Sequence, residues 1–201
     1  MIKEYEILRE DFRKCASTIP IDYEQLKKMI DMGIELNEKP NTEGETLVGD
    51  IIFSCINDYE ERQFNLRFGE MQYAEEYVEV YNNNREELKN IKNYAGKNAY
   101  ELLVFFMDNG FDPCMYDGIA GTSVVASLVY QRNSYTEKII NLLFETSFHP
   151  GRVDGDTLSG LYAFEYYYWT YEVPDSEEVE AYDRLYKMLK AYEEKHNVYS
   201  E

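Results

Sequence analysis

Apolar side chains recur at every third or fourth position along most of the chain, and this spacing predicts α-helices. Capping residues, glycines and prolines mark where these helices begin and end. The pattern therefore predicts an all-α fold built from packed helix pairs. The expected helices cover residues 3–15, 22–33, 71–81, 85–94, 98–110, 122–131 and 175–195, and two more begin at Thr46 and Ser134.

The clearest unit in this pattern spans residues 98 to 124. Asn98 and Glu101 form a capping box that predicts a helix start, and Asn109-Gly110 supplies a left-handed stop. Asp112-Pro113 prevents the helix from continuing, because proline lacks the required N–H. Thr122 precedes two valines and is the expected N-cap of the next helix. The unit is helix, exposed turn, helix.

Weaker copies of this unit lie on both sides of it. In the earlier copy, Asp22 caps a helix that Gly33 ends, and Thr46 caps the next one. The later copy is offset by 147 minus 110, or 37 residues, and several of its positions match at that one offset. The matched pairs are Gly110-Phe111-Asp112-Pro113 with Ser147-Phe148-His149-Pro150, Asp117 with Asp154, Thr122 with Ser159, and Val124 with Leu161.

Residues 58–97 interrupt this rhythm, since they are polar and rich in asparagine. We interpret them as an insertion within the repeat array. Such an insertion either emerges on one face and carries recognition, or it only lengthens two helices. The sequence leaves both interpretations open.

The charge of the chain limits the partners that it can have. Its 201 residues contain 20 Lys and Arg against 39 Asp and Glu, a formal net charge of -19. This charge disfavours nucleic acid and anionic membranes, and it indicates either solubility or a basic protein partner. The three cysteines are odd in number and far apart, which argues against disulfides and a zinc site. The N-terminus has no apolar signal region, so we expect a cytoplasmic protein without a membrane span.

A helix that ends in Gly-x-Asp-Pro and is followed by Asp and a helix led by Thr resembles the ankyrin repeat. The handful of matching positions spans roughly residues 20 to 170. The matches are Gly110-Phe111-Asp112-Pro113, Asp117 and Thr122 in the central copy, Gly33, Asn37, Gly44 and Thr46 in the earlier copy, and Pro150, Asp154 and Ser159 in the later copy. The Thr-Pro-Leu-His signature of that family stands here as Thr46-Leu47-Val48-Gly49, without its Pro and His.

This resemblance implies one domain over residues 1–201, an ankyrin-like solenoid of about four antiparallel helix pairs with one long insertion. Residues 1–33 would be its N-terminal pair and residues 158–196 its C-terminal pair. It also implies a non-catalytic protein-binding function on a concave surface, where the copies differ beside their shared turns. The expected binding residues are Met115, Tyr116, Val153, Asp156, Tyr162, Tyr166 and Trp169.

The 20 tyrosines are the outlier in composition, and several of them crowd residues 162–171 together with Trp169. Tyrosine offers a large apolar area with a hydrogen-bonding tip, which suits both a repeat seam and a binding surface. The aromatic run surrounds its helix, so some of it is expected outside the core. Whether most of it is buried under the last helix stays open.

Candidate catalytic chemistry is sparse. His149 and His196 are not positioned for a triad, Asp154-Gly155-Asp156 lacks the rest of a calcium loop, and no phosphate-binding glycine loop occurs. We therefore expect no catalytic residues, metal or cofactor, and a monomer that binds another protein. The alternatives are an acidic inhibitor or immunity protein that neutralises a basic toxin or nuclease, and, less favoured, an enzyme that uses paired carboxylates and a metal.

Overall fold

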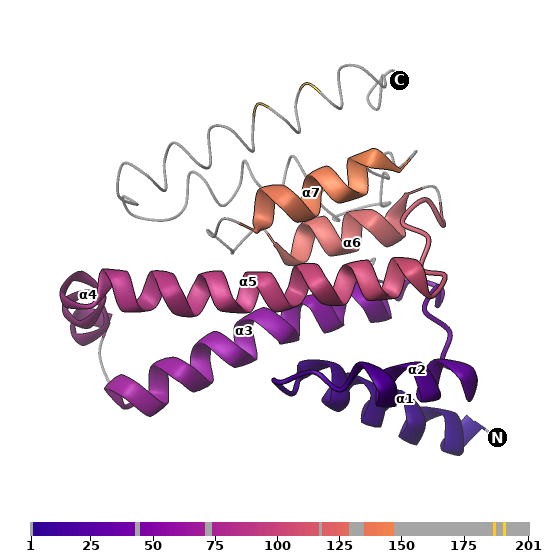
Figure 1. The fold of residues 1–201 in the computed structure, drawn as a ribbon, viewed down its shortest axis with the longest axis horizontal. Coiled ribbons are helices and arrows are strands. Elements are labelled where there is room, and N and C mark those ends of the chain that lie inside the picture. The colour runs from indigo at the N-terminus through magenta and orange to yellow at the C-terminus, as the bar shows by residue number, and fades with distance from the viewer. Residues whose placement is uncertain are drawn as a thin grey trace.

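The computed structural model describes residues 2–42, 45–70, 74–116, 118–128 and 135–146, together with residues 187 and 191. The regular elements within these residues are all helices, which confirms the predicted all-α class (Figure 1). The proposed C-terminal pair at 158–196, including the aromatic run, lies almost wholly outside the described residues. The helices are α1 (Ile2–Ser17), α2 (Tyr23–Asp31), α3 (Leu47–Phe68), α4 (Ala74–Asn83), α5 (Arg85–Asp108), α6 (Ile119–Ser127) and α7 (Thr136–Glu145).

Two long antiparallel helices, α3 and α5, form the centre of the fold (Figure 1). The short helices α1 and α2 lie on one side of this pair, and α6 and α7 lie on the other. α3 makes its most extensive contacts with α5 and α6, and it also packs against α1. α1, α2, α6 and α7 therefore assemble around one end of the α3–α5 pair, and α4 lies at the other end (Figure 1).

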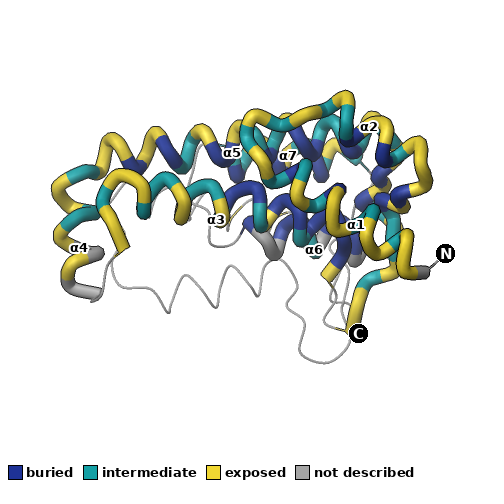
Figure 2. Tube along the Cα trace, turned by 90° about the horizontal axis from the view of Figure 1, so that it is seen from below, coloured by how far each residue is buried: buried dark blue, intermediate teal, exposed yellow. Residues whose placement is uncertain are grey.

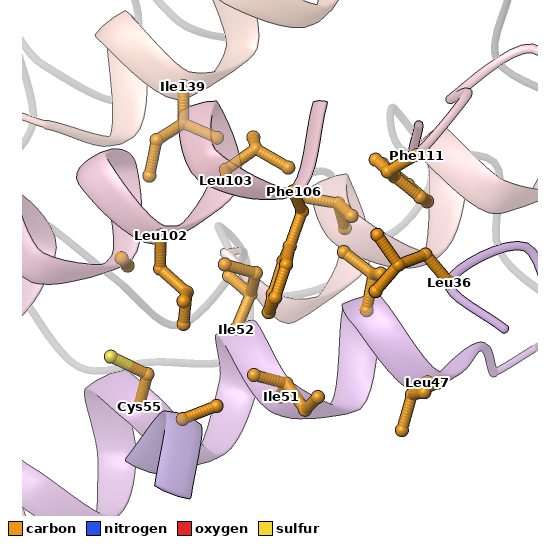
Figure 3. Close-up of a cluster of buried hydrophobic side chains, with 14 of the residues drawn as sticks. Leu36, Leu47, Ile51, Ile52, Cys55, Leu102, Leu103, Phe106, Phe111 and Ile139 are labelled. Atoms are coloured by element: carbon orange, nitrogen blue, oxygen red, sulfur yellow. The ribbon is translucent and has the colours of Figure 1, made fainter. Parts of the chain in front are cut away.

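The core lies where these layers meet. Ile51, Ile52 and Cys55 of α3 face Leu102 and other residues of α5, and all of them are fully buried (Figure 3). The ring of Phe106 lies 5.8 Å from that of Phe12, so it joins α5 to α1. Burial of these apolar side chains, at about 25 cal/mol per Å², supplies most of the driving force for packing. The remaining fully buried members include Leu103, Val124, Ile139, Ile140 and Leu143.

Two helix starts follow the capping signals of the sequence. The Asp22 carboxylate accepts a hydrogen bond from the Gln25 N–H at 2.9 Å, at the start of α2. The Thr46 hydroxyl accepts one from the Gly49 N–H at 3.2 Å, at the start of α3. Each bond satisfies a backbone donor that the first helical turn leaves without an intrahelical partner. These two predictions are confirmed.

The two stop glycines are also confirmed, and they end α2 and α5 in the same way. Gly33 has φ 112° and Gly110 has φ 100°, a region that side-chain-bearing residues rarely adopt. The N–H of the next residue then donates to the carbonyl five residues earlier, from Ile34 to Met29 at 3.2 Å and from Phe111 to Phe106 at 2.9 Å. The two helix ends that the sequence matched to each other therefore share one local geometry.

The helix start predicted at Asn98 is wrong. α5 begins at Arg85, so Asn98 lies in its interior, where its side-chain amide donates to the Tyr94 carbonyl at 2.7 Å. The buried stripe of Leu88, Ile91 and Ala95 continues the apolar face of the helix through this point. That packing outweighs the local preference of the capping box, because helices in proteins are stabilised mainly by their buried face.

The predicted N-cap at Thr122 is also wrong, because α6 begins at Ile119. The preceding loop is tightly turned, with Gly118 at φ 86° and the Gly121 N–H donating to the Pro113 carbonyl at 2.9 Å. These bonds lead the chain into a helix three residues before the threonine. At α7 the N-cap is Tyr135, without a side-chain capping bond, whereas the predicted cap Ser134 lies outside the described residues.

Residues 58–97 lengthen the central helices. Their described residues form the second half of α3, α4 and the first half of α5, with Gly69, Glu70 and Asn84 between these helices. We call residues 58–68, 74–83 and 85–97 the arm. It extends beyond the part of the fold that α1, α2, α6 and α7 cover (Figure 1).

Candidate functional site

The seven predicted binding residues divide into two groups. Met115 and Tyr116 lie in the loop between α5 and α6, as expected. Val153, Asp156, Tyr162, Tyr166 and Trp169 lie outside the described residues. The described part of the candidate site therefore consists of the α5–α6 loop and the residues that hold this loop in place.

Asn37, in the loop between α2 and α3, joins that loop to the α5–α6 loop. Its side-chain amide donates to the Gly110 carbonyl at 2.8 Å, and its side-chain oxygen accepts from the Asp112 N–H at 2.9 Å. Its backbone carbonyl accepts from the Tyr116 hydroxyl at 2.9 Å. Three hydrogen bonds between two irregular segments satisfy backbone groups that the helix ends leave open. We call residues 31–42 and 108–116 the loop edge.

Tyr116 is shaped by this contact. Its φ of 57° is in the left-handed region, which costs a non-glycine residue about 1 kcal/mol or more. The bond from its hydroxyl to Asn37 offsets part of that cost and fixes the side chain, which is half-buried. Met115 beside it is 37% exposed. Of the two predicted residues, Met115 is thus the one whose side chain is open to a partner.

Asp112 is a turn residue, in agreement with its interpretation as part of the repeat. Its carboxylate accepts a hydrogen bond from the Cys114 N–H at 2.9 Å, which closes an Asx turn directly after the stop glycine. The next residue, Pro113, is buried. The turn therefore presents Met115 on a backbone that is held by hydrogen bonds on both sides.

Glu38 fastens the other side of the loop edge to α1. Its carboxylate accepts from the Tyr5 hydroxyl at 2.7 Å and pairs with the Arg9 guanidinium at 2.8 Å. Burial, and then the hydrogen bond to Glu38, raise the pKa of Tyr5 to about 12. Tyr5 therefore stays a hydrogen-bond donor at every physiological pH. The α2–α3 loop is held by α1 on one side and by the α5–α6 loop on the other.

The exposed charges of the loop edge are mostly acidic. Glu35, Asp108 and Asp112 are exposed, and within the described residues none of them forms an ion pair. Lys39 is an exposed cation of the same edge, but these carboxylates outnumber it and produce a negative local potential that acts on partners within about 10 Å at ordinary salt. Exposed methionine adds a soft apolar contact that adapts to different surfaces. Together these features suit binding of a polypeptide with basic side chains.

The thiols offer little reactivity. Burial raises the pKa of Cys55 to about 12, and burial also raises the pKa of Cys15 and of Cys114. A thiol with a raised pKa is a poor nucleophile, since the thiolate is the reactive form. Within the described residues, no group of three or more His, Cys, Asp or Glu side chains could hold a metal ion.

Sequence reasoning did not find the role of Asn37. It matched Asn37 to a consensus position but did not include it among the seven expected binding residues. The signal available was that both Asn37 and Asp112 follow a stop glycine. Equivalent turns in neighbouring units of a repeat stack lie side by side, so these two residues could have been paired.

Replacing Asn37 with alanine is expected to lower the free energy of unfolding by about 1–2 kcal/mol, because it removes two hydrogen bonds to backbone groups. Asn98 gives a matched control, since its amide bonds only within its own helix. Asn98→Ala should change stability by less than about 0.5 kcal/mol. Urea unfolding followed by far-UV circular dichroism measures both. Equal effects of the two substitutions would show that Asn37 does not join the loops.

A scan against family models, a search of curated proteins and a search of solved structures each found no match to the chain. In the part of the chain that the structure describes, no helix is both long and apolar enough to cross a membrane.

Proposed function

We propose that the chain is a non-catalytic protein-binding module, an ankyrin-like solenoid whose loop edge contacts another protein. The observation that carries this proposal is the set of three hydrogen bonds of Asn37. They hold the α2–α3 loop and the α5–α6 loop together as one surface, on which Met115 is exposed. A surface fixed before binding loses less conformational entropy when a partner docks. The proposal includes a monomer in the cytoplasm, acting without a cofactor.

The ankyrin-like organisation is supported by the two matching helix ends at Gly33 and Gly110 and by the side-by-side turns that follow them. In a repeat stack, equivalent turns line one edge and are the usual place for binding residues, because the helices beneath them carry the core. This organisation predicts that Val153 and Asp156 belong to the next turn along the same edge.

A loop-edge double variant tests the proposal. Glu35→Ala with Met115→Ser removes an exposed acid and an exposed apolar group without touching the Asn37 bonds. The matched control is Glu6→Ala with Ile7→Ser on α1, where Ile7 is 55% exposed. A protein captured by the wild type from native extract is identified and purified, and its Kd is measured for each variant.

The loop-edge variant should raise Kd by about tenfold or more, which is about 1.4 kcal/mol, and the α1 variant should leave it near the wild-type value. If the loop-edge variant and the α1 variant bind with equal affinity, the partner does not bind at the loop edge. If the wild type captures no partner that binds the purified chain, the interaction function is wrong.

The second candidate, an acidic inhibitor or immunity protein, is favoured by the net charge of -19. A basic toxin or nuclease would be attracted over distances of a Debye length, and its association rate would fall steeply as salt is raised. This candidate requires that the captured protein is basic and that the chain suppresses its activity. A captured partner that is neutral or acidic would exclude it.

A further inference from the structure

We call the line along which α3 and α5 meet, on the side where α2 packs, the seam. It continues past the start of α2. On α2, the first residue Tyr23 packs on Phe105 of α5, with ring centroids 5.2 Å apart. Burial raises the pKa of Tyr23 to about 12, and the nearby Glu101 and Cys55 contribute to this shift. The Tyr23 ring therefore packs on α5 at the Phe105 end of the seam.

The next positions along the same seam lie in the arm. Tyr59 follows Cys55 by one helical turn, and Tyr94 precedes Phe105 by eleven residues, which is close to three turns and places both on one face of α5. The rings of Tyr59 and Tyr94 pack against each other at 5.3 Å. Leu66 follows Tyr59 by two turns on α3. The apolar seam that α2 covers at one end thus extends to these three residues.

Exposure changes sharply along this seam. Cys55 and the α2 residue Leu26 are fully buried, whereas Tyr94 is 45% exposed and Leu66 is 74% exposed. No described helix covers the arm on this side, and exposed and half-buried positions alternate along it (Figure 2). Exposed aromatic and large aliphatic side chains in a row are typical anchors of protein interfaces.

Two ion pairs lie beside this seam, and Arg62, between Tyr59 and Leu66 on α3, is an exposed cation. Lys97 pairs with Glu101 at 3.6 Å along α5, and Arg67 of α3 pairs with Glu87 of α5. Each pair is neutral in itself, so an apolar surface can approach these four side chains without leaving one of their charges unpaired. The chain as a whole still carries -19, so it attracts basic proteins and repels a second copy of itself.

We propose that the seam of Tyr59, Leu66 and Tyr94 binds an amphipathic helix of a basic partner protein. The occupant is a helix because the same seam already accepts the start of α2, and the binding surface is a direct continuation of that packing. Its apolar stripe contacts the three seam residues, and its Lys and Arg side chains are attracted by the net negative charge of the chain. This surface is distinct from the loop edge and does not depend on it.

A phage-displayed library of peptides about 16 residues long is the probe, a length that spans roughly four helical turns. The full chain is the bait. Selected peptides should share apolar residues at helical spacing and an excess of Lys and Arg. Tyr94→Ser with Leu66→Ser should weaken the selected peptides by about tenfold or more in fluorescence anisotropy. Both positions are exposed, and urea unfolding verifies that the variant folds.

The matched control is Ile7→Ser on α1, which removes an apolar side chain that is 55% exposed and lies away from both the seam and the loop edge. It should leave peptide affinity unchanged, and so should the loop-edge variant, so this test and that of the proposed function can fail separately. The proposal is overturned if no peptide is selected or if the seam variant binds as the wild type does. It is also overturned if sedimentation shows a wild-type dimer that the seam variant dissociates, because a second copy is then the occupant.

Discussion

Glu60→Gln is expected to stabilise the protein by about 3 kcal/mol above pH 7 and to have almost no effect below about pH 4.5. Burial raises the pKa of Glu60 from 4.5 to about 7, and the weaker attraction of Lys92 opposes the shift. One carboxylate oxygen is buried without a hydrogen-bond donor in the described part of the chain. Ionisation is therefore disfavoured in the folded state relative to the unfolded chain.

The sign of the pH dependence follows from the direction of this shift. Between about pH 4.5 and 7, the folded protein holds a proton on Glu60 that the unfolded chain has released. The stability contributed by the neutral group is complete below pH 4.5 and is lost as the pH rises to about 7. Glutamine stays neutral at every pH, so the variant retains this stability.

Urea unfolding of wild type and variant between about pH 4.5 and 8.5 measures the difference. Glu61→Gln is the matched control, because Glu61 is the neighbouring residue and is exposed. It changes the net charge equally and should shift stability by less than about 0.5 kcal/mol. A gain for Glu60→Gln that is the same at both ends of the pH range would show that burial of its charge does not limit stability.

The helix ends that could be predicted from the sequence are those whose interactions are local. Asp22 and Thr46 each bond to an N–H three residues later, and Gly33 and Gly110 each need only their own φ. A pattern of neighbouring residues contains all of that information. The start predicted at Asn98 was wrong because the buried face of α5 continues through it, and the start predicted at Thr122 was wrong because the bonds of the preceding loop begin α6 at Ile119.

The candidate site was predictable only in part for the same reason. The register of the repeats placed Met115 and Tyr116 in an exposed turn, and the structure confirms their position in the α5–α6 loop. The bonds that fix the turn come from Asn37, which lies 73 to 79 positions earlier in the chain. Periodicity and capping signals do not extend over such separations. The stacking of Tyr59 on Tyr94 is a second contact of this kind.

Gly49 has a packing role that the sequence pattern did not indicate. In the resemblance to the ankyrin repeat it stands where the Thr-Pro-Leu-His signature has histidine. In the structure it faces Ser123 of α6, whose hydroxyl accepts a hydrogen bond from the Thr46 N–H at 3.1 Å. The absence of a side chain at Gly49 is what allows α3 and α6 to approach so closely.

Gly49→Ala is expected to lower the free energy of unfolding by about 2–3 kcal/mol, although alanine is the better helix former by about 1 kcal/mol. The added Cβ would overlap the Ser123 hydroxyl and would lie 2.9 Å from the Ser123 Cβ and 3.0 Å from its carbonyl carbon. The last of these atoms is backbone, so a side-chain rotation cannot remove the clash. α3 and α6 must move apart, which opens the core that they share.

The double variant Gly49→Ala with Ser123→Gly separates this clash from other effects. Ser123→Gly alone should destabilise the protein by about 1–2 kcal/mol, through its helix propensity and the lost bond to Thr46. If Gly49 is needed for close packing, the double variant loses less free energy of unfolding than the sum of the two single losses, by about 1 kcal/mol or more. Strict additivity, or a higher thermal midpoint for Gly49→Ala than for the wild type, would show that α3 and α6 do not need glycine at this contact.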